Sequence, residues 1–108
     1  GGGKKAGRGR AMKRQREKEF ANKREKAQEL KRRRAKALDK LREATQKEEL
    51  PLLLEAVRLA RTARMEGVYA GVKWRFPELS AGLELADALH KREEEVAALR
   101  LEQMKLTN

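Results

Sequence analysis

Apolar residues are sparse over residues 11–49 and become denser and more regular after residue 50. The first segment has neither Gly nor Pro and consists mostly of Lys, Arg, Glu, Gln, Ala and Leu, which are good helix formers. Its apolar residues follow a 3–4 spacing, at Phe20, Ala27, Leu30, Ala37, Leu41 and Ala44. Lys23 and Arg34 interrupt that stripe, which would make a poor coiled coil on its own. The pattern therefore predicts a long, mostly solvated helix over residues 11–49 that rests on something else.

Leu50-Pro51 interrupts the pattern, because proline disfavours helix at the residue before it and suits the first turn of a new one. The long helix should end or kink there. A second helix is predicted over residues 51–66, with a buried face formed by Leu53, Leu54, Val57 and Ala60. Gly67 is expected to stop this helix as its C′ residue.

Residues 67–76 form a predicted connector with strand-like alternation, in which Val72, Trp74 and Phe76 share one side. Phe76-Pro77-Glu78 then indicates another helix start, with proline in the first turn and an acidic residue at the positive end of the helix dipole. The third helix is predicted over residues 77–105. Its expected face consists of Leu79, Leu83, Ala86, Leu89, Val96, Leu99 and Met104.

The two shorter helices should pack antiparallel as a hairpin over residues 50–108, the one part of the chain expected to form a core. The predicted fold is all-α: a long basic helix, then a small antiparallel helical hairpin. Because so small a core rarely suffices alone, the hairpin is expected to dock on a partner. The docking residues inferred from the sequence are Leu53, Leu54, Val57, Trp74, Phe76, Leu79 and Leu83.

Charge changes this picture, because 28 basic and 17 acidic residues give a net charge of +11 at pH 7. The first 50 residues carry 19 basic and 8 acidic side chains, whereas the remainder carries 9 of each. Residues 1–10 are rich in glycine and contain no acidic residue, which predicts a flexible or extended basic arm. The chain begins with Gly1, as expected of a fragment or a processed product.

The sequence offers little for catalysis. It has no cysteine, and its opening glycines precede neither a strand nor a Gly-Lys-Ser/Thr motif. His90 and Glu94 stand one helical turn apart without an evident third metal ligand, and no Ser or Thr accompanies a histidine motif. No apolar run approaches the roughly 20 residues of a membrane span. We expect no enzyme activity, cofactor, metal or small-molecule substrate, and no membrane partner.

The basic half indicates RNA as the partner, because Lys and Arg side chains that reach phosphates release counterions. Within Lys31-Arg32-Arg33-Arg34, successive side chains turn by about 100° and surround the helix with charge. A charged single-helix spacer is the simpler alternative, but a spacer gains nothing from so large an excess. The predicted nucleic-acid contacts are Lys4, Lys5, Arg8, Arg10, Lys13, Arg14, Arg16, Lys23, Arg24, Lys26, Lys31, Arg32, Arg33, Arg34, Lys36, Lys73 and Arg75.

The connector holds three of the four aromatic residues, Tyr69, Trp74 and Phe76. They could stack on nucleobases, with Lys73 and Arg75 beside them. The favoured interpretation is structural: Trp74 and Phe76 close the open end of the hairpin while the basic pair faces outward.

Taken together, the pattern favours a non-catalytic structural component of a large ribonucleoprotein that contacts RNA, ribosomal RNA above all, and neighbouring proteins. A basic arm, a long Arg/Lys helix and a small hairpin are common in structural proteins of ribosomes, including mitochondrial ones, which is an analogy of architecture. The alternative is a cytoskeletal or axonemal scaffold whose long helix lies on an acidic filament such as a microtubule. A nuclear localisation signal and a calmodulin target are minor alternatives.

Overall fold

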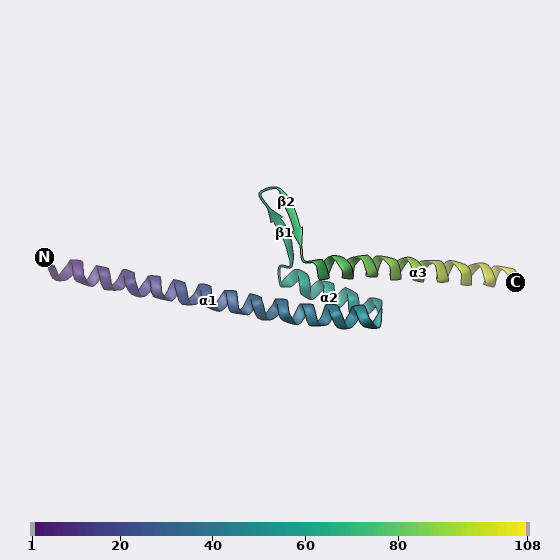
Figure 1. Cartoon of the computed structure of the whole chain (residues 1–108), viewed down its shortest axis with the longest axis horizontal. Coiled ribbons are helices and arrows are strands. Elements are labelled where there is room, and N and C mark those ends of the chain that lie inside the picture. Colours follow the sequence, from purple (N-terminus) through teal and green to yellow (C-terminus); the bar gives the residue numbers. More distant parts are fainter. Residues whose placement is uncertain (1, 108) are drawn as a thin grey trace. The chain divides into compact units, whose positions relative to one another are not determined.

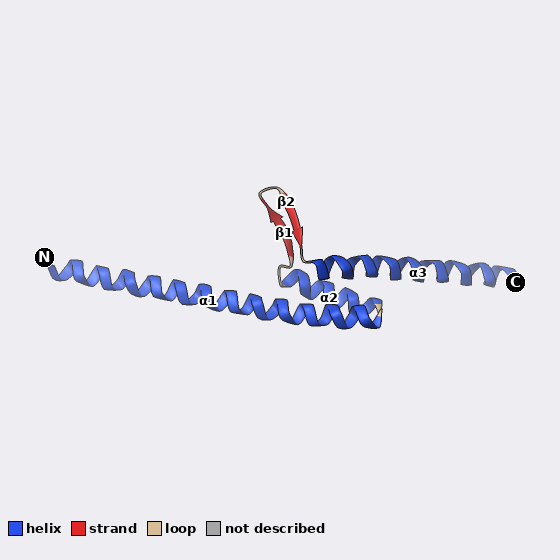
Figure 2. Ribbon diagram, in the orientation of Figure 1, coloured by secondary structure: helices blue, strands red, loops and turns tan. Residues whose placement is uncertain are grey.

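The computed structural model describes residues 2–107, with side chains from residue 10 onward. The chain divides into two compact units, Gly1–Arg32 and Arg33–Asn108, called unit 1 and unit 2 below. Along the chain, the elements are α1 (Gly2–Lys47), α2 (Leu50–Thr62), β1 (Glu66–Tyr69), β2 (Val72–Arg75) and α3 (Pro77–Thr107) (Figures 1 and 2). The predicted all-α class is confirmed, with a small two-stranded sheet added to it.

The helix α1 begins at Gly2, so residues 2–10 are helical rather than an extended arm. This corrects the prediction made from their glycine content. Elongating an existing helix costs far less than nucleating one, and no proline interrupts these residues. The helix of residues 11–47 can therefore extend over them.

The predicted break before Pro51 is confirmed, and its geometry is that of an αL cap. Glu48 has a φ of 51°, and its N–H donates to the Ala44 carbonyl oxygen at 2.9 Å. Glu49 is extended and occupies the N-cap position of α2. Pro51 follows in the first turn of α2, where a missing N–H costs no helical hydrogen bond.

The end of α2 differs from the prediction, because Arg64 and not Gly67 is its left-handed residue. Arg64 has a φ of 54° and donates its N–H to the Arg61 carbonyl at 3.1 Å, while the Met65 N–H donates to the Ala60 carbonyl at 3.1 Å. This pair of hydrogen bonds defines a Schellman cap. Met65 is completely buried, so its burial in the core fixes the point at which the helix ends.

Residues 67–76, predicted as a connector, contain most of an antiparallel β-hairpin (Figure 2). Its strands pair Glu66 with Arg75 at one end and Tyr69 with Val72 at the other. Ala70 and Gly71 form the two-residue turn with φ of 50° and 77°, as a type I′ turn requires. Every side chain of β2 is exposed, so neither face of the hairpin is buried in the described part of the chain.

The core of unit 2 draws on three helices and not only on the two predicted. In α1, Ala37, Leu41 and Ala44 are buried, and they join residues of α2 and α3 in one cluster. The other buried members are Leu53, Ala56, Val57, Ala60, Ala63, Met65, Leu79 and Ala86. The end of α1 in unit 2 thus rests on the hairpin of α2 and α3, because its 3–4 stripe supplies the small apolar face that these helices need.

Gly82 of α3 allows α1 and α3 to approach each other within unit 2. A Cβ atom at Gly82 would lie 3.0 Å from Leu41 Cδ2, and both residues are buried. The sequence indicated only that this glycine weakens the helix. The structure shows the compensating gain, which is close packing against Leu41.

The predicted start of α3 at Pro77 is confirmed, and its N–H groups at Leu79 and Ser80 both donate to the Phe76 carbonyl at 3.1 Å. Beyond Leu89 every described side chain of α3 is exposed, including Val96, Leu99 and Met104 of the predicted apolar face. Among the described residues, no helix is both long and apolar enough to cross a membrane.

Candidate nucleic-acid interface

Unit 1 presents a cationic surface along α1. Residues 10–32 include ten basic and four acidic side chains, and all of these charged side chains are exposed. The predicted contacts in this range are Arg10, Lys13, Arg14, Arg16, Lys23, Arg24, Lys26, Lys31 and Arg32. The side chains of Lys4, Lys5 and Arg8 lie outside the part of the chain whose side chains are described. The surface can attract a polyanion from any direction around the helix.

One aromatic ring lies among these cations. Phe20 is 61% exposed, and the guanidinium of Arg24 sits 4.8 Å from its ring centroid. A shallow hollow of about 440 Å³ on this side of the helix is lined by Lys13, Arg16, Glu17, Phe20, Ala21 and Arg24. The hollow thus combines an exposed ring with three basic side chains and the carboxylate of Glu17.

Arg34 has a different role from the one predicted. Its Nε donates to the Ala63 carbonyl at 3.1 Å and its Nη2 to the Arg64 carbonyl at 2.9 Å. The same guanidinium lies 5.2 Å from the Phe76 ring centroid. Arg34 thus caps the carbonyl end of α2, and we leave it out of the RNA-binding set. Arg33 and Lys36, its neighbours in that set, are exposed.

The last turn of α1 carries an i,i+4 ion pair. Lys47 Nζ lies 3.1 Å from Glu43 Oε1, and both side chains are about half exposed. The hydrogen bond and charge of Lys47, with a smaller effect of Lys40, lower the pKa of Glu43. This lysine is therefore engaged with a carboxylate of its own helix, and it was not among the predicted phosphate contacts.

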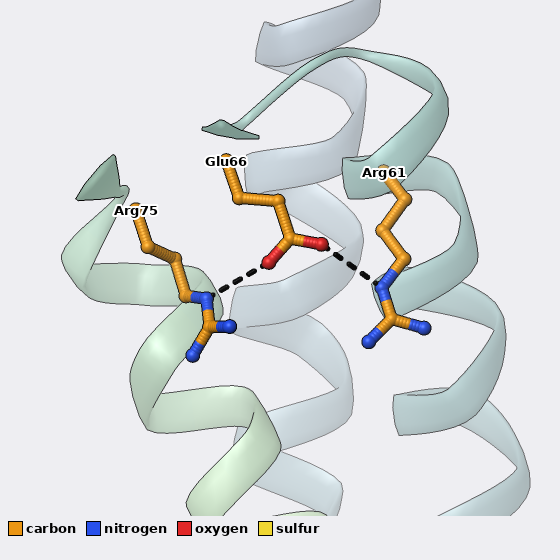
Figure 3. Close-up of polar contacts among 3 residues, drawn as sticks. All are labelled: Arg61, Glu66 and Arg75. Carbon is orange, nitrogen blue, oxygen red and sulfur yellow. Dashed lines mark hydrogen bonds and ion pairs between the residues drawn. The ribbon is translucent and has the colours of Figure 1, made fainter. Parts of the chain in front are cut away.

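A carboxylate with two arginines fixes the base of the β-hairpin (Figure 3). Glu66 Oε2 accepts from Arg75 Nε at 2.9 Å, and Glu66 Oε1 accepts from Arg61 Nε at 3.2 Å. Arg75, a predicted phosphate contact, thus already has one carboxylate partner. The three side chains keep a net positive charge, and Lys73 is exposed on the same strand.

Most of the predicted docking residues belong to the core. Leu53, Val57 and Leu79 are at most 4% exposed, so they cannot meet a partner, and Leu83 is half-buried against the same cluster. The prediction was wrong for Leu53, Val57 and Leu79, because a core built largely of alanines uses these larger side chains on its inner faces. Leu54, at 56% exposed, is the one leucine of this set that remains available.

The two aromatic residues predicted to close the hairpin have separate positions. Phe76 packs against the core, whereas Trp74 is 39% exposed and lies 6.3 Å from Phe76 between ring centroids. Tyr69 is 80% exposed, and the predicted set of site residues did not include it. The aromatic cluster of the connector had already indicated Tyr69 as a ring that could stack on nucleobases, and the turn at Ala70-Gly71 places it opposite Val72.

His90 and Glu94 are in contact, with Nε2 and Oε1 3.0 Å apart, and both side chains are largely exposed. The described residues contain no group of three potential metal ligands. No protein-family model matches the sequence, and neither a curated protein nor a solved structure shows significant similarity to it.

Proposed function

We propose that this chain is a non-catalytic structural component of a large ribonucleoprotein, such as a mitochondrial or other organellar ribosome, and that it binds RNA phosphates through unit 1. The observation that carries the proposal is the excess of exposed cations along residues 10–32. Unit 2 would then hold the chain in place among neighbouring molecules of the assembly.

The distribution of charge around the helix favours RNA over a one-sided protein surface. With a turn of about 100° per residue, Lys13, Arg14 and Lys23 point to three different sides of α1, and Lys26 lies next to Lys23. A helix on a flat acidic filament would need cations on one side only. A helix enclosed by folded RNA meets phosphates on several sides, so cations all around it are useful there.

The binding free energy should come largely from counterion release. Each phosphate neutralised contributes about 0.7–0.9 to the slope of log affinity against log salt concentration. Affinity should therefore fall steeply with salt and depend little on RNA sequence, because phosphate contacts carry no sequence information.

The test compares two variants of the full chain that lose the same charge in different places. One changes Lys13, Arg14, Lys23 and Lys26 to Gln. The control changes Lys91, Arg92, Arg100 and Lys105, which are exposed cations of unit 2, to Gln. Fluorescence anisotropy with a labelled structured RNA is measured over a range of salt concentrations. In the first variant, we expect the slope of log affinity against log salt concentration to decrease in magnitude by up to about 3. In the control, this slope should change much less.

Equal losses in the two variants would show that net charge alone governs binding and would contradict the proposal. Competition between the RNA and microtubules for the unmodified chain distinguishes the ribonucleoprotein component from the cytoskeletal scaffold. If an excess of RNA does not displace the chain from the filaments, the result would favour the cytoskeletal scaffold instead.

A further inference from the structure

The β-hairpin has one face without a charged side chain, and the core of unit 2 does not cover it. Residues directly opposite each other in a sheet lie on the same face. The register therefore puts Gly67, Tyr69, Val72 and Trp74 together on one face and Glu66, Val68, Lys73 and Arg75 on the other. Tyr69 is 80% exposed, Val72 66% and Trp74 39%. An uncovered aromatic face of this kind indicates a binding surface.

The structure holds this face in a fixed arrangement. The ring of Trp74 lies directly over Gly67, where a Cβ atom would stand only 2.9 Å from Trp74 Cζ2. Phe76, anchored in the core, donates its N–H to the Met65 carbonyl at 2.9 Å and thereby joins the two ends of the hairpin. With the Glu66 ion pairs at its base, the hairpin presents its rings on a preorganised support, which lowers the entropic cost of binding.

Charge indicates the chemistry of the ligand. The second half of the chain is neutral in total, yet residues 58–75 contain five basic residues and one acidic residue, Glu66. The positive charge of this half thus gathers at the hairpin and the helix end that leads into it. A shallow hollow of about 540 Å³ along the hairpin is lined by Glu66, Gly67, Val68, Lys73, Trp74 and Arg75. It brings Trp74 together with Lys73, while Arg75 is paired with Glu66. A ligand that fits both the rings and the cations is flat, apolar on its faces and negatively charged.

We infer that the hairpin binds unpaired nucleotides, with nucleobases stacked on Tyr69 and Trp74 and the phosphates of the adjoining chain at Lys73, on the other face of the same strand. The inference rests on the proposed function, because it states which part of that RNA the hairpin would contact. Stacking needs bases free of a duplex, so the ligand is a single-stranded segment or a loop. A protein neighbour with an apolar surface would leave the gathered cations unused.

Trp74 is the only tryptophan of the chain, so its fluorescence reports on this face directly. The full chain is titrated with an unstructured RNA oligonucleotide, with an RNA duplex of equal length and with inorganic polyphosphate. Displacement of a labelled RNA measures the binding of each ligand independently. We expect the single strand to quench Trp74 strongly, the duplex weakly and polyphosphate not at all, although all three bind through unit 1.

Two variants with matched exposure test the stacking. Tyr69→Ala should weaken binding of the single strand by about ten-fold and leave binding of polyphosphate unchanged. Leu106→Ala removes an apolar side chain, 85% exposed, from α3 outside the hairpin and should change neither affinity. Circular dichroism of both variants checks that unit 2 remains folded.

Binding of the single strand without quenching would overturn this inference, while the proposed function would stand. Equal quenching by polyphosphate, or equal losses in the two variants, would overturn it as well. Failure of all three ligands to bind would instead overturn the proposed function.

Discussion

The guanidinium of Arg34 links α1 to the end of α2, where its two partner residues lie 29 and 30 positions further along the chain. It donates to the carbonyls of Ala63 and Arg64, which the end of α2 leaves without helical partners. Its position over the Phe76 ring adds a cation–π contact. A flat guanidinium with several fixed donors can satisfy all of these contacts at once, and an ammonium cannot.

Arg34→Lys should therefore lower the free energy of unfolding of unit 2 by about 1–3 kcal/mol. Arg42→Lys, the same change at an exposed position of α1, should have little effect. Urea unfolding followed by circular dichroism measures both. Since charge is retained, affinity for RNA should not change in either variant. A loss of RNA affinity with unchanged stability would return Arg34 to the phosphate contacts.

Arg64 adopts the left-handed conformation in which side chains other than glycine are strained. Its backbone closes the Schellman cap, and its side chain is exposed. Arg64→Gly should thus raise the free energy of unfolding by up to about 1 kcal/mol. Arg64→Ala loses the same charge and keeps the Cβ atom, so it should bring no such gain. Thermal unfolding of the two variants side by side gives the comparison, and a Gly variant no more stable than the Ala variant would contradict the strain at this residue.

At the scale of elements, the end of α1 in unit 2 acts as the third helix of a small core. Leu41 is 1% exposed and touches the site where Gly82 lacks a side chain. Leu41→Ala should cost about 2–5 kcal/mol of stability, because it leaves a cavity that the surrounding alanines cannot fill. Leu54→Ala, at a position 56% exposed, should cost well under half as much. Chemical denaturation of both variants distinguishes this arrangement from a core formed by α2 and α3 alone.

The sequence identified helix starts well, because Pro51 and Pro77 act locally through a fixed φ and a missing N–H. It misplaced the end of α2, because burial of Met65 determines that end and no local signal competes with Gly67. Ala70-Gly71 is a weaker turn signal than Asn-Gly, so the sequence indicates the β-hairpin only by the alternation of apolar and basic residues. In each case the missing information is a contact between residues that are not neighbours in the sequence.

The same division applies to the candidate site. Exposed cations of unit 1 follow directly from the sequence, because a helix with so few apolar residues has nothing to bury. The fate of Arg34 depended on two carbonyls about 30 residues away, which periodicity cannot reveal. Leu53 and Leu79 belong to the core and not to a partner surface, because α1 contributes Ala37, Leu41 and Ala44 to that core.

At the scale of the whole molecule, the two units differ in what stabilises them. Unit 2 has a buried core, whereas no described side chain of unit 1 is buried. Helices without tertiary contacts depend on local propensity and i,i+4 charge pairs, which leave them marginal in water. The cooperative unfolding transition of the chain should therefore belong to unit 2, and unit 1 should melt gradually.

Two exposed alanines of α1 allow the separate melting of the two units to be tested, because the same substitution can be made in each unit. Ala21 lies in unit 1 and Ala35 in unit 2, two residues before buried Ala37. Proline inside a helix removes a hydrogen bond and clashes with the preceding turn, at a cost of about 3 kcal/mol or more. Ala35→Pro should thus lower the midpoint of thermal unfolding sharply. Ala21→Pro should reduce the helical signal at low temperature and leave that midpoint where it is.

The Ala21 variant also connects stability to function, because a helix that is marginal alone should be ordered by its ligand. On heating, the unmodified chain should lose ellipticity as unit 1 melts, and saturating RNA should restore part of that loss. The restored part should be much smaller in Ala21→Pro, since proline prevents the helix from forming around that residue. RNA affinity should fall in this variant while unit 2 unfolds normally. If Ala21→Pro instead shifted the midpoint as far as Ala35→Pro does, the chain would unfold as a single cooperative body, and order in unit 1 would come from unit 2 and not from RNA.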